Sequence, residues 1–355
     1  MTGQDTPFGN FHEHFVTQSF QPFAEFEWHP LPRVVVTAGI KAADYKMDLN
    51  QYQDVKTVQC LGGTLVKAVA GVSPAVCVGG AAFTTHDVNY NNWLPTLTAR
   101  YRVWKAWSIY GQFAEGSVIP PSNVFDVPGG NVLVPPKPTV ARTYQGGTVL
   151  KFNRFTLDMD GYYVHFQNGY NSFTDALSNE PVYYPTGPSN TKGFEAEGNV
   201  ALGHGLSLYA NLSVGSAKYQ TGPGIANGGL WVPNTPSNIE GLSLLWQHRN
   251  WDFGFTYKRV GQYYNDYGAI NQAIKIDPFD LENAFLNYTI KNASHLRGTK
   301  IQLAFNNIAD SHNIVGITPA STTPASYAAN GGDLLNLLPG RSISLTVTGG
   351  WAPRR

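Results

Sequence analysis

The sequence predicts an all-β protein of antiparallel strands. Three observations predict it: apolar and polar residues alternate along many segments, the connections between these segments alternate in length, and the composition combines little charge with many aromatic residues. Charged residues are 14% of the 355 residues and aromatic residues are 13%, whereas a typical soluble domain carries about 25% charged residues. The mean hydropathy is nevertheless slightly negative. This combination is typical of a sheet with one face in lipid and the other in water.

Residues 250–258 show the alternation most clearly. One set of side chains is aromatic, and it consists of Trp251, Phe253, Phe255 and Tyr257. The set between them is small or polar, and it consists of Asp252, Gly254, Thr256 and Lys258. Because successive side chains of a strand point to opposite faces, this segment as a strand has one apolar and one polar face. A helical period of 3.6 residues would scatter the same aromatic residues around the helix.

The alternation and the turn residues together predict thirteen strands. They cover residues 15–29, 32–45, 92–103, 106–115, 141–152, 154–167, 192–202, 205–216, 237–247, 250–263, 278–291, 298–306 and 340–351. Short connections lie near Pro30, Trp104, Asn153, His204, Arg249 and Ala293, and long ones cover about 46–91, 116–140, 168–191, 217–236, 264–277 and 307–339. Short periplasmic turns and long extracellular loops are typical of an antiparallel transmembrane β-barrel of the outer-membrane type. No apolar stretch reaches the roughly 18 residues that an ordinary transmembrane helix needs.

The long connections have the composition of exposed, irregular loops, with paired prolines and glycines and many Asn, Thr and Tyr residues. The first of them, at 46–91, contains both cysteines, Cys60 and Cys77. Two cysteines in one loop of an exported protein most simply form a local disulfide, because the periplasm is oxidising. The alternative is a pair of unpaired buried thiols.

The tryptophans give the predicted barrel a direction. Six of the eight lie beside a short turn or at the end of the last strand: Trp28, Trp104, Trp107, Trp246, Trp251 and Trp351. An indole ring prefers the membrane–water interface, where the ring is half buried and the N–H stays hydrated. We therefore expect these six to form the periplasmic aromatic girdle. The alternative is a set of core tryptophans in a soluble sandwich.

Four segments resemble motifs of TonB-dependent outer-membrane receptors. They are the strand–turn–strand of residues 21–41 (QPFAEFEWHPLPRVVVTAGIK), the strand of residues 191–197 (TKGFEAE), the element of residues 305–310 (FNNIAD) and the last strand of residues 338–347 (LPGRSISLTV). Each motif is weak alone, but the four occur in the family's order over most of the chain. The sequence is therefore similar to the C-terminal part of the barrel of this family.

The resemblance implies a barrel of about 22 strands that is plugged by an N-terminal domain. Such a receptor lies in the bacterial outer membrane and imports ferric siderophores or similar nutrients with energy from TonB. Residues 1–355 would then form a single incomplete domain of about 13 strands, in which the signal peptide, the TonB box and the plug are absent from the sequence. The expected partners are outer-membrane lipid and, for the full-length protein, a small-molecule ligand such as a ferric chelate. TonB would bind only through the missing N-terminal region.

Ligand contacts are expected from aromatic and polar residues of the long loops. The candidates are His86, Asp87, Tyr90, Trp93, Tyr170, Tyr219, Trp231, Tyr263, Tyr264 and Tyr267. Aromatic side chains provide a large contact area and, in Tyr and Trp, a polar group as well. The alternative for each of them is a place in the extracellular aromatic girdle.

The sequence contains no motif that predicts an enzyme, a cofactor or a metal site. Glu195 and Glu197 share one face of a strand, where a polar barrel lumen explains them better than a catalytic carboxylate pair does. The net charge is zero, so no nucleic-acid partner is expected. Two other functions remain open from the sequence: a complete smaller porin or channel, and a soluble β-rich carbohydrate-binding protein.

Overall fold

The computed structural model describes residues 13–51, 57–60, 65–67, 77–79, 85–120, 137–174, 181–185, 187–222, 228–265, 274–291, 298–318 and 334–349. All of the regular elements in these ranges are β-strands. None of the described segments is a helix long and apolar enough to cross a membrane.

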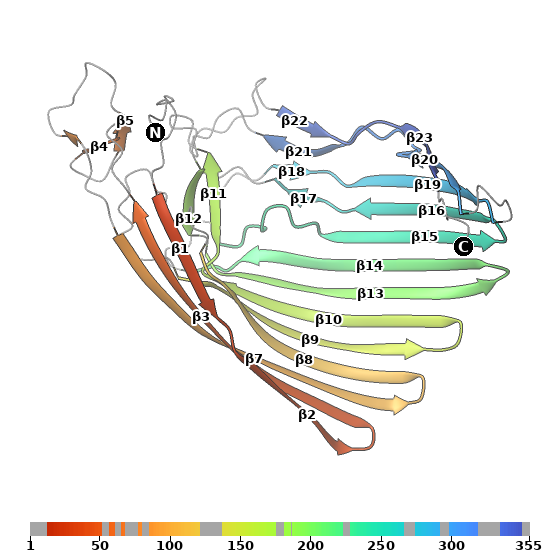
Figure 1. The fold of residues 1–355 in the computed structure, drawn as a ribbon, viewed down its shortest axis with the longest axis horizontal. Coiled ribbons are helices and arrows are strands. Elements are labelled where there is room, and N and C mark those ends of the chain that lie inside the picture. The colour runs from red at the N-terminus through yellow and green to blue at the C-terminus, as the bar shows by residue number, and fades with distance from the viewer. Residues whose placement is uncertain are drawn as a thin grey trace, which may run out of the picture.

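Fourteen strands form one large antiparallel sheet (Figure 1). The first two both pair with the third, and from the third onward each strand pairs with the next in chain order. The strands are β1 (Glu13–Phe20), β2 (Phe23–Leu31), β3 (Val34–Gln51), β7 (Thr85–Trp104), β8 (Trp107–Val118), β9 (Thr139–Lys151), β10 (Phe155–Gln167), β13 (Ser189–Gly203), β14 (Leu206–Tyr219), β15 (Asn238–His248), β16 (Trp251–Val260), β19 (Phe279–Thr289), β20 (Lys300–Asn306) and β23 (Ser342–Thr348). This meander confirms the predicted all-β, antiparallel fold.

The thirteen predicted strands correspond to these fourteen because one prediction covers two strands. β1 and β2 both pair with β3, one after the other, and a break at Gln21 and Pro22 separates them. Proline has no N–H to donate to a ladder, so it interrupts the pairing. The sequence alternates on both sides of the break, and the prediction of one strand at 15–29 was wrong in this respect.

Strand structure also extends into the region predicted as the first long loop. β3 continues to Gln51 and β7 begins at Thr85, and their ladder is unbroken from Val34 to Asn50 on the β3 side. The loop that was expected at 46–91 is therefore shorter than the sequence indicated. Tyr45, Met47 and Leu49 still alternate with polar residues there, but these apolar residues lie on the opposite face from Val34, Val36 and Ile40. The alternation thus changes phase within β3, where the prediction ended the strand.

The long connections are more regular than their composition predicted, because four of them contain small antiparallel sheets. These are β4 (Thr57–Cys60) with β5 (Leu65–Lys67) and β6 (Cys77–Gly79), β11 (Tyr170–Thr174) with β12 (Pro181–Pro185), β17 (Tyr263–Tyr264) with β18 (Lys275–Ile276), and β21 (Ile314–Thr318) with β22 (Leu334–Leu337). All of them lie at one end of the large sheet, toward the left of Figure 1, and the short turns lie at the other end. The predicted segregation of long loops from short turns is thus present.

The register divides the large sheet into two faces. One row of directly opposed residues crosses eight neighbouring strands: Ile109, Thr148, Met159, Ala196, Leu212, Glu240, Arg259 and Asp280. The row begins near the short turn before β8 and ends at the long-loop end of β19. The strands are therefore staggered in one direction, as the tilted strands of a barrel are.

The face that contains this row is called the apolar face here. Large hydrophobic side chains are exposed along it, among them Phe26, Trp28, Ile40, Trp93, Leu97, Tyr101, Tyr144, Tyr163, Phe194, Val214, Leu242, Trp251, Ile343, Leu345 and Val347. So much contiguous apolar surface is unfavourable in water and is suited to lipid. The opposite face, called the polar face, contains the residues between them.

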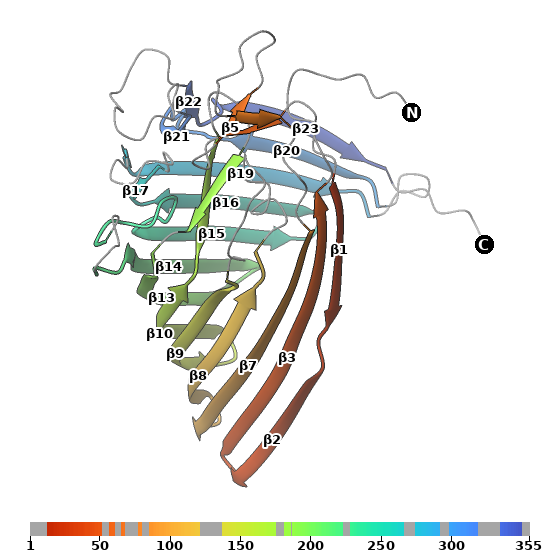
Figure 2. The ribbon, with the colours of Figure 1, turned by 90° about the vertical axis from the view of Figure 1, so that its left-hand side faces the viewer.

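The sheet is strongly curved, and the strand direction turns progressively from β2 to β20 (Figure 2), as the handed twist of strands requires. Within the described residues, β23 pairs only with β20, and β1 and β2 pair only with β3. The sheet is therefore open at these two edges. Its buried apolar residues are confined to small clusters, such as Met47, Val88 and Tyr90. Strand ladders, more than a dry core, hold this fold together.

The short turns are tight and position side chains at their ends. In the turn between β13 and β14, Gly203, His204 and Gly205 all have positive φ. A Cβ at Gly205 would lie 1.7 Å from the Gln247 carbonyl oxygen, so only glycine fits there. In the turn between β7 and β8, a register shift after Arg102 places Trp104 opposite Trp107, on the apolar face.

Candidate functional site

The polar face has a cluster of four carboxylates at its centre. Asp158 and Asp160 of β10 lie directly opposite Glu197 and Glu195 of β13. The Tyr209 hydroxyl donates to Glu197 Oε2 at 3.1 Å, and the Ser213 hydroxyl donates to Glu195 Oε1 at 3.1 Å. The two glutamates thus lie on the polar face, where the alternation predicted them.

Glycines beside this cluster make room for two tyrosine rings. A Cβ at Gly147 would lie 2.7 Å from Tyr110 Cζ, and a Cβ at Gly193 would lie 2.6 Å from the Tyr162 hydroxyl oxygen. The two rings therefore cross the neighbouring strands close to the backbone, which only glycine allows. The result is a flat wall of tyrosine rings and carboxylates on the polar face.

One oxygen of Asp158 and one of Asp160 are buried without a hydrogen-bond partner among the described residues. A buried carboxylate oxygen without a donor is unfavourable, because the group has lost its hydration. The carboxylates of Glu195 and Glu197 are exposed and can accept hydrogen bonds or positive charge from a group that faces the wall. No group of three or more metal-ligating side chains lies close enough together to hold a metal ion in the part of the chain that the structure describes.

Some of the predicted ligand contacts lie together at the long-loop end. Trp231 packs against Tyr264, with ring centroids 6.3 Å apart, and its indole N–H donates to the Thr235 carbonyl oxygen at 2.7 Å. Lys218 Nζ lies 5.8 Å from the centre of the Trp231 ring. Tyr219 is the last residue of β14, next to Lys218. These side chains form a polar and aromatic group beside the end of the sheet.

Two other predicted ligand contacts, Tyr90 and Tyr263, are buried. Tyr90 is 7% exposed and packs with Met47. Tyr263 is 9% exposed, and its hydroxyl donates to the Val315 carbonyl oxygen at 2.6 Å. Burial raises the pKa of the Tyr263 hydroxyl above its ordinary value, so it stays a hydrogen-bond donor. Both tyrosines therefore stabilise the base of the loops.

Two candidates, Asp87 and Trp93, lie on the apolar face. Trp93 is 62% exposed, and both it and Asp87 belong to the apolar face by their register with β3. Their contact with a ligand stays a prediction. His86 lies in β7 and Tyr170 in β11, and Tyr267 is outside the described residues.

The loops are joined to one another by side-chain amides that sequence reasoning missed. The Asn265 amide donates to the Ile317 carbonyl oxygen at 2.7 Å and accepts from the Ile317 N–H at 3.1 Å. This pair connects the loop after β16 to the loop after β20. An exposed-loop asparagine gives no signal in sequence that it will form such a bridge.

A second bridge involves two of the motifs quoted above. Asn307 is 2% exposed, and its amide donates to the carbonyl oxygens of Ser311 and Pro339, both at 2.8 Å. Asp310 Oδ1 accepts the Arg341 backbone N–H at 2.8 Å. The segments 305–310 and 338–347 therefore meet at the start of β23, which gives a physical reason for both motifs.

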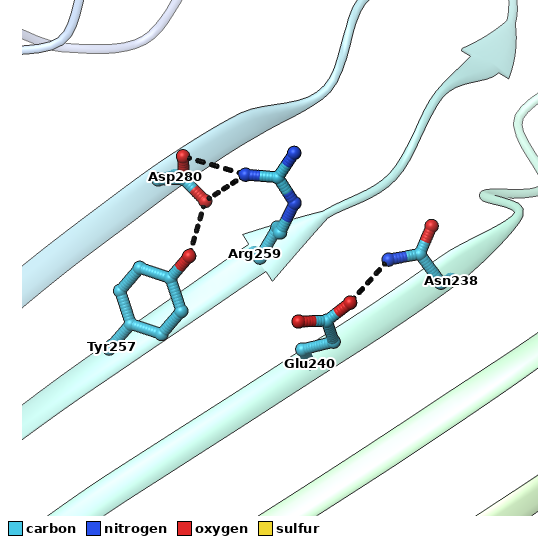
Figure 3. Close-up of polar contacts among 5 residues, drawn as sticks. All are labelled: Asn238, Glu240, Tyr257, Arg259 and Asp280. Carbon is cyan, nitrogen blue, oxygen red and sulfur yellow. Dashed lines mark hydrogen bonds and ion pairs between the residues drawn. The ribbon is translucent and has the colours of Figure 1, made fainter.

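On the side of the long loops, the apolar face is bordered by polar and charged residues. Figure 3 shows Arg259 of β16, whose Nη1 donates to both carboxylate oxygens of Asp280 at 3.0 Å, with the Tyr257 hydroxyl donating to Asp280 at 2.7 Å. On β15, the Asn238 amide donates to Glu240 at 2.8 Å. Such charged groups mark the level at which the apolar band stops.

The described tryptophans of the predicted girdle all lie at the short-turn end. Trp28, Trp104, Trp107 and Trp251 are 40–60% exposed on the apolar face. The Trp107 indole N–H donates to Thr148 Oγ1 at 2.7 Å. Trp351 lies outside the described residues. This placement is the one that a girdle at the short-turn interface requires, and the girdle itself stays a prediction.

The two cysteines are brought opposite each other. Cys60 in β4 and Cys77 in β6 are directly paired in the register of the first loop's small sheet. Cα atoms of opposed residues in an antiparallel pair are about 4.5–5.5 Å apart, within the range that a disulfide spans. The backbone thus permits the predicted disulfide, which remains a prediction.

Comparison with known proteins agrees with this geometry. The family model for the TonB dependent receptor-like β-barrel matches residues 2–308. Among solved structures, the chain is similar to the ferric-catecholate import receptor Fiu of E. coli K12, with a TM-score of 0.67 at 18% identity over 94% of this chain and 45% of that one. It is similar to the ferric yersiniabactin uptake receptor FyuA of Yersinia pestis, with a TM-score of 0.69 at 15% identity over 94% and 46%.

A third similar structure is the copper transporter OprC, with a TM-score of 0.64 at 15% identity over 94% of this chain and 48% of that one. The chain thus spans about half the length of the solved structures it matches. At these identities the structural likeness shows the fold, while the match to the family model covers most of the sequence. The chain belongs to the TonB-dependent receptor β-barrel family.

Proposed function

We propose that the chain is part of the wall of an outer-membrane receptor that imports a ferric siderophore or a similar metal chelate with energy from TonB. The observation that carries the proposal is the division of one staggered antiparallel sheet into an apolar and a polar face, with long loops at one end. In outer-membrane barrels the apolar side faces lipid and the polar side faces the lumen. The family match supports the same interpretation.

The substrate class is proposed from the relatives and from the long-loop end. The similar structures are named for ferric-catecholate import, ferric yersiniabactin uptake and copper transport. In this chain, Trp231 and Tyr264 offer aromatic rings beside the loops. An aromatic surface favours a ring-containing chelate.

The proposed orientation places the short turns in the periplasm and the long loops outside the cell. The exposed tryptophans at the short-turn end support it, because indole rings favour the interface. The carboxylate wall of the polar face would then line the lumen. Cys60 and Cys77 would lie on the extracellular side in an oxidised loop. Alkylation of the native protein without reductant is expected to label neither cysteine, and labelling of both would contradict the disulfide.

The import proposal is tested by deleting the gene and measuring growth and radioactive iron uptake with catecholate and hydroxamate ferric chelates. Loss of uptake of at least one chelate is expected, with recovery when the gene is restored. The same loss is expected in a strain that lacks TonB, because the family's transport requires its energy.

A passive channel is the second candidate, because a polar face alone would also suit a water-filled pore. It predicts uptake that continues without TonB and rises in proportion to external concentration. Saturable, TonB-dependent uptake would exclude the channel. Unchanged uptake of every chelate in the deletion strain would contradict the import of iron.

A further inference from the structure

Three of the long connections, those after β14, β16 and β20, are bonded to one another and are called the joined loops here. Their described parts are residues 220–222 with 228–237, 261–265 with 274–278, and 307–318 with 334–341. Figure 1 shows the small sheets of the last two, β17–β18 and β21–β22, beside each other at the long-loop end, and β18 contacts β21. The loop after β16 lies between the other two and is called the middle loop.

Three consecutive residues of the middle loop contact both of its neighbours, because their side chains alternate. The Tyr264 ring lies against the loop after β14, with its centroid 6.3 Å from that of Trp231. Tyr263 and Asn265 reach the loop after β20 instead, and the Tyr263 hydroxyl donates to the Val315 carbonyl oxygen at 2.6 Å. Successive side chains of an extended segment point to opposite sides. Residues 263–265 thus connect the middle loop in both directions.

The Asn265 amide pairs with the backbone of the loop after β20 as a peptide group of a neighbouring strand would. It donates to the Ile317 carbonyl oxygen at 2.7 Å and accepts from the Ile317 N–H at 3.1 Å. An asparagine amide has both a donor and an acceptor, so it can bond both backbone groups of one residue. Asn265 is 7% exposed. Leaving buried hydrogen-bonding groups unpaired is unfavourable, so this bridge resists separation of the two loops.

Apolar side chains of the same two loops also pack together. Val260, Tyr263 and Ile276 are at most 9% exposed, and Phe279 and Ile317 pack against them. Val260 is the last residue of β16 and Phe279 is the first of β19, so this cluster also fixes the loops to the strand ends. Burial of apolar surface in water favours the joined arrangement.

Backbone hydrogen bonds connect the middle loop to the loop after β14. The Asn234 N–H donates to the Tyr264 carbonyl oxygen at 2.7 Å, and the Ser237 N–H donates to the Gln262 carbonyl oxygen at 3.0 Å. Together with the Trp231 ring contact, these bonds extend the series of contacts across all three loops. Segments connected in this way tend to open as one cooperative unit.

We propose that the joined loops form one cooperative unit, in which residues 263–265 couple the loop after β14 to the loop after β20. Loosening of either outer loop is then transmitted to the other through the middle loop. A ligand that contacts Trp231 or Tyr264 accordingly changes the stability of the segment around Ile317. This last consequence rests on the proposed function, whereas the coupling itself does not depend on any ligand.

The test measures amide hydrogen exchange of the full-length protein in detergent, without ligand. Asn265→Ala removes both side-chain bonds to Ile317, and the Ile317 amide should exchange roughly tenfold faster, as expected for the loss of two hydrogen bonds. The coupling predicts a second effect in the other outer loop, which Asn265 does not bond through these contacts. The Asn234 and Ser237 amides should also exchange faster, by at least roughly threefold, because they open with the same unit.

Tyr263→Phe is a milder variant, because it keeps the ring in its cluster and removes only the hydroxyl bond to the Val315 carbonyl oxygen. It should accelerate exchange in the segments 228–237 and 314–318 by a smaller factor. The matched control is Asn336→Ala, since Asn336 is an exposed asparagine of β22. It should leave exchange in the segment 228–237 unchanged.

Unchanged exchange of the amides of β14 and β16 would show that each variant keeps the sheet intact. If Asn265→Ala and Tyr263→Phe accelerated exchange only in the middle loop and around Ile317, the loops would open independently and the proposal would be wrong. Amides of residues 228–237 that are unprotected in the wild type would overturn it as well. Failure of the uptake experiments would contradict the proposed function but leave this coupling unaffected.

Discussion

The two faces of the large sheet share one backbone but carry side chains of opposite polarity. On β16, Phe253 and Phe255 face the apolar side, while Asp252 and Thr256 face the polar side, and the ladder hydrogen bonds are shared by both. On the polar face, side chains bond to one another, as Tyr209 does to Glu197. On the apolar face, large side chains are exposed and make few specific contacts. The difference teaches that the solvent on each side, rather than internal packing, selects the residues.

This comparison also explains why the described part of the molecule has so little buried core. In water, exposed apolar residues would have to collapse together, whereas in lipid they already have a favourable environment. Every backbone group at that depth must then be bonded within the sheet. A charged substitution should therefore destabilise the fold much more on the apolar face than on the polar face.

The largest expected effect tests that asymmetry directly. Leu244→Arg places a charge in the middle of the apolar face of β15, between Leu242 and Trp246, and it should destabilise the folded protein by about 2–4 kcal/mol in lipid vesicles. Ser243→Arg, one residue away on the polar face, should cost less than about 1 kcal/mol. Denaturant unfolding of both variants in vesicles measures the difference. Equal losses would mean that the two faces are misassigned.

The next effect concerns a polar side chain that is buried where the loops meet. Asn307→Ala removes a buried amide that donates to the Ser311 and Pro339 carbonyl oxygens and accepts from the Ser311 N–H. Loss of these three bonds should destabilise the start of β23 by about 1–3 kcal/mol. Asn306→Ala is the control, since that neighbour is exposed and bonds only the Ser342 hydroxyl among described residues. Hydrogen exchange of β23 amides would reveal the difference. Equal protection in the two variants would show that burial does not matter here.

A smaller effect is expected at the charged border of the apolar face. Arg259 and Asp280 form a partly exposed pair, with side chains 40% and 36% exposed. Solvent screening reduces the free energy by which such an ion pair stabilises the fold. A double-mutant cycle with Arg259→Gln and Asp280→Asn should give a coupling well below the effect of Leu244→Arg, and the coupling should decrease with added salt. A salt-independent coupling would indicate that lipid, and not water, surrounds the pair.

The smallest effect is a pH dependence confined to the loop end. The Arg341 N–H bond to Asp310 holds the pKa of that carboxyl below its ordinary value, with a further contribution from His312. A depressed folded-state pKa means that the bond stabilises the loop fully above the unfolded pKa of about 4 and less as pH falls through the folded value. Protection of the Arg341 amide from exchange should therefore drop below about pH 4. Asp310→Asn should remove this drop, and a drop that persists would assign it to another group.

Much of this protein was determined by its sequence alone. Period-2 alternation, as in residues 251–258, predicted nearly every strand and which residues share a face, because a strand has no other way to place successive side chains. Connection lengths and tryptophan positions predicted which end carries the loops. The alternation likewise assigned neighbours such as Phe194 and Glu195 to opposite faces, and their pairing with β10 agrees with that assignment.

Contacts between strands distant in sequence were decided only by the tertiary structure. Alternation says nothing of how neighbouring strands are staggered, so the row of opposed residues from Ile109 to Asp280 depends on the register of each hairpin. The loops were harder still, because the bonds of Asn265 and Asn307 join segments that only the pairing of the strands brings together. Local pattern reflects the solvent on each face, whereas stagger and loop contacts result from hydrogen bonds between strands, which no single segment encodes.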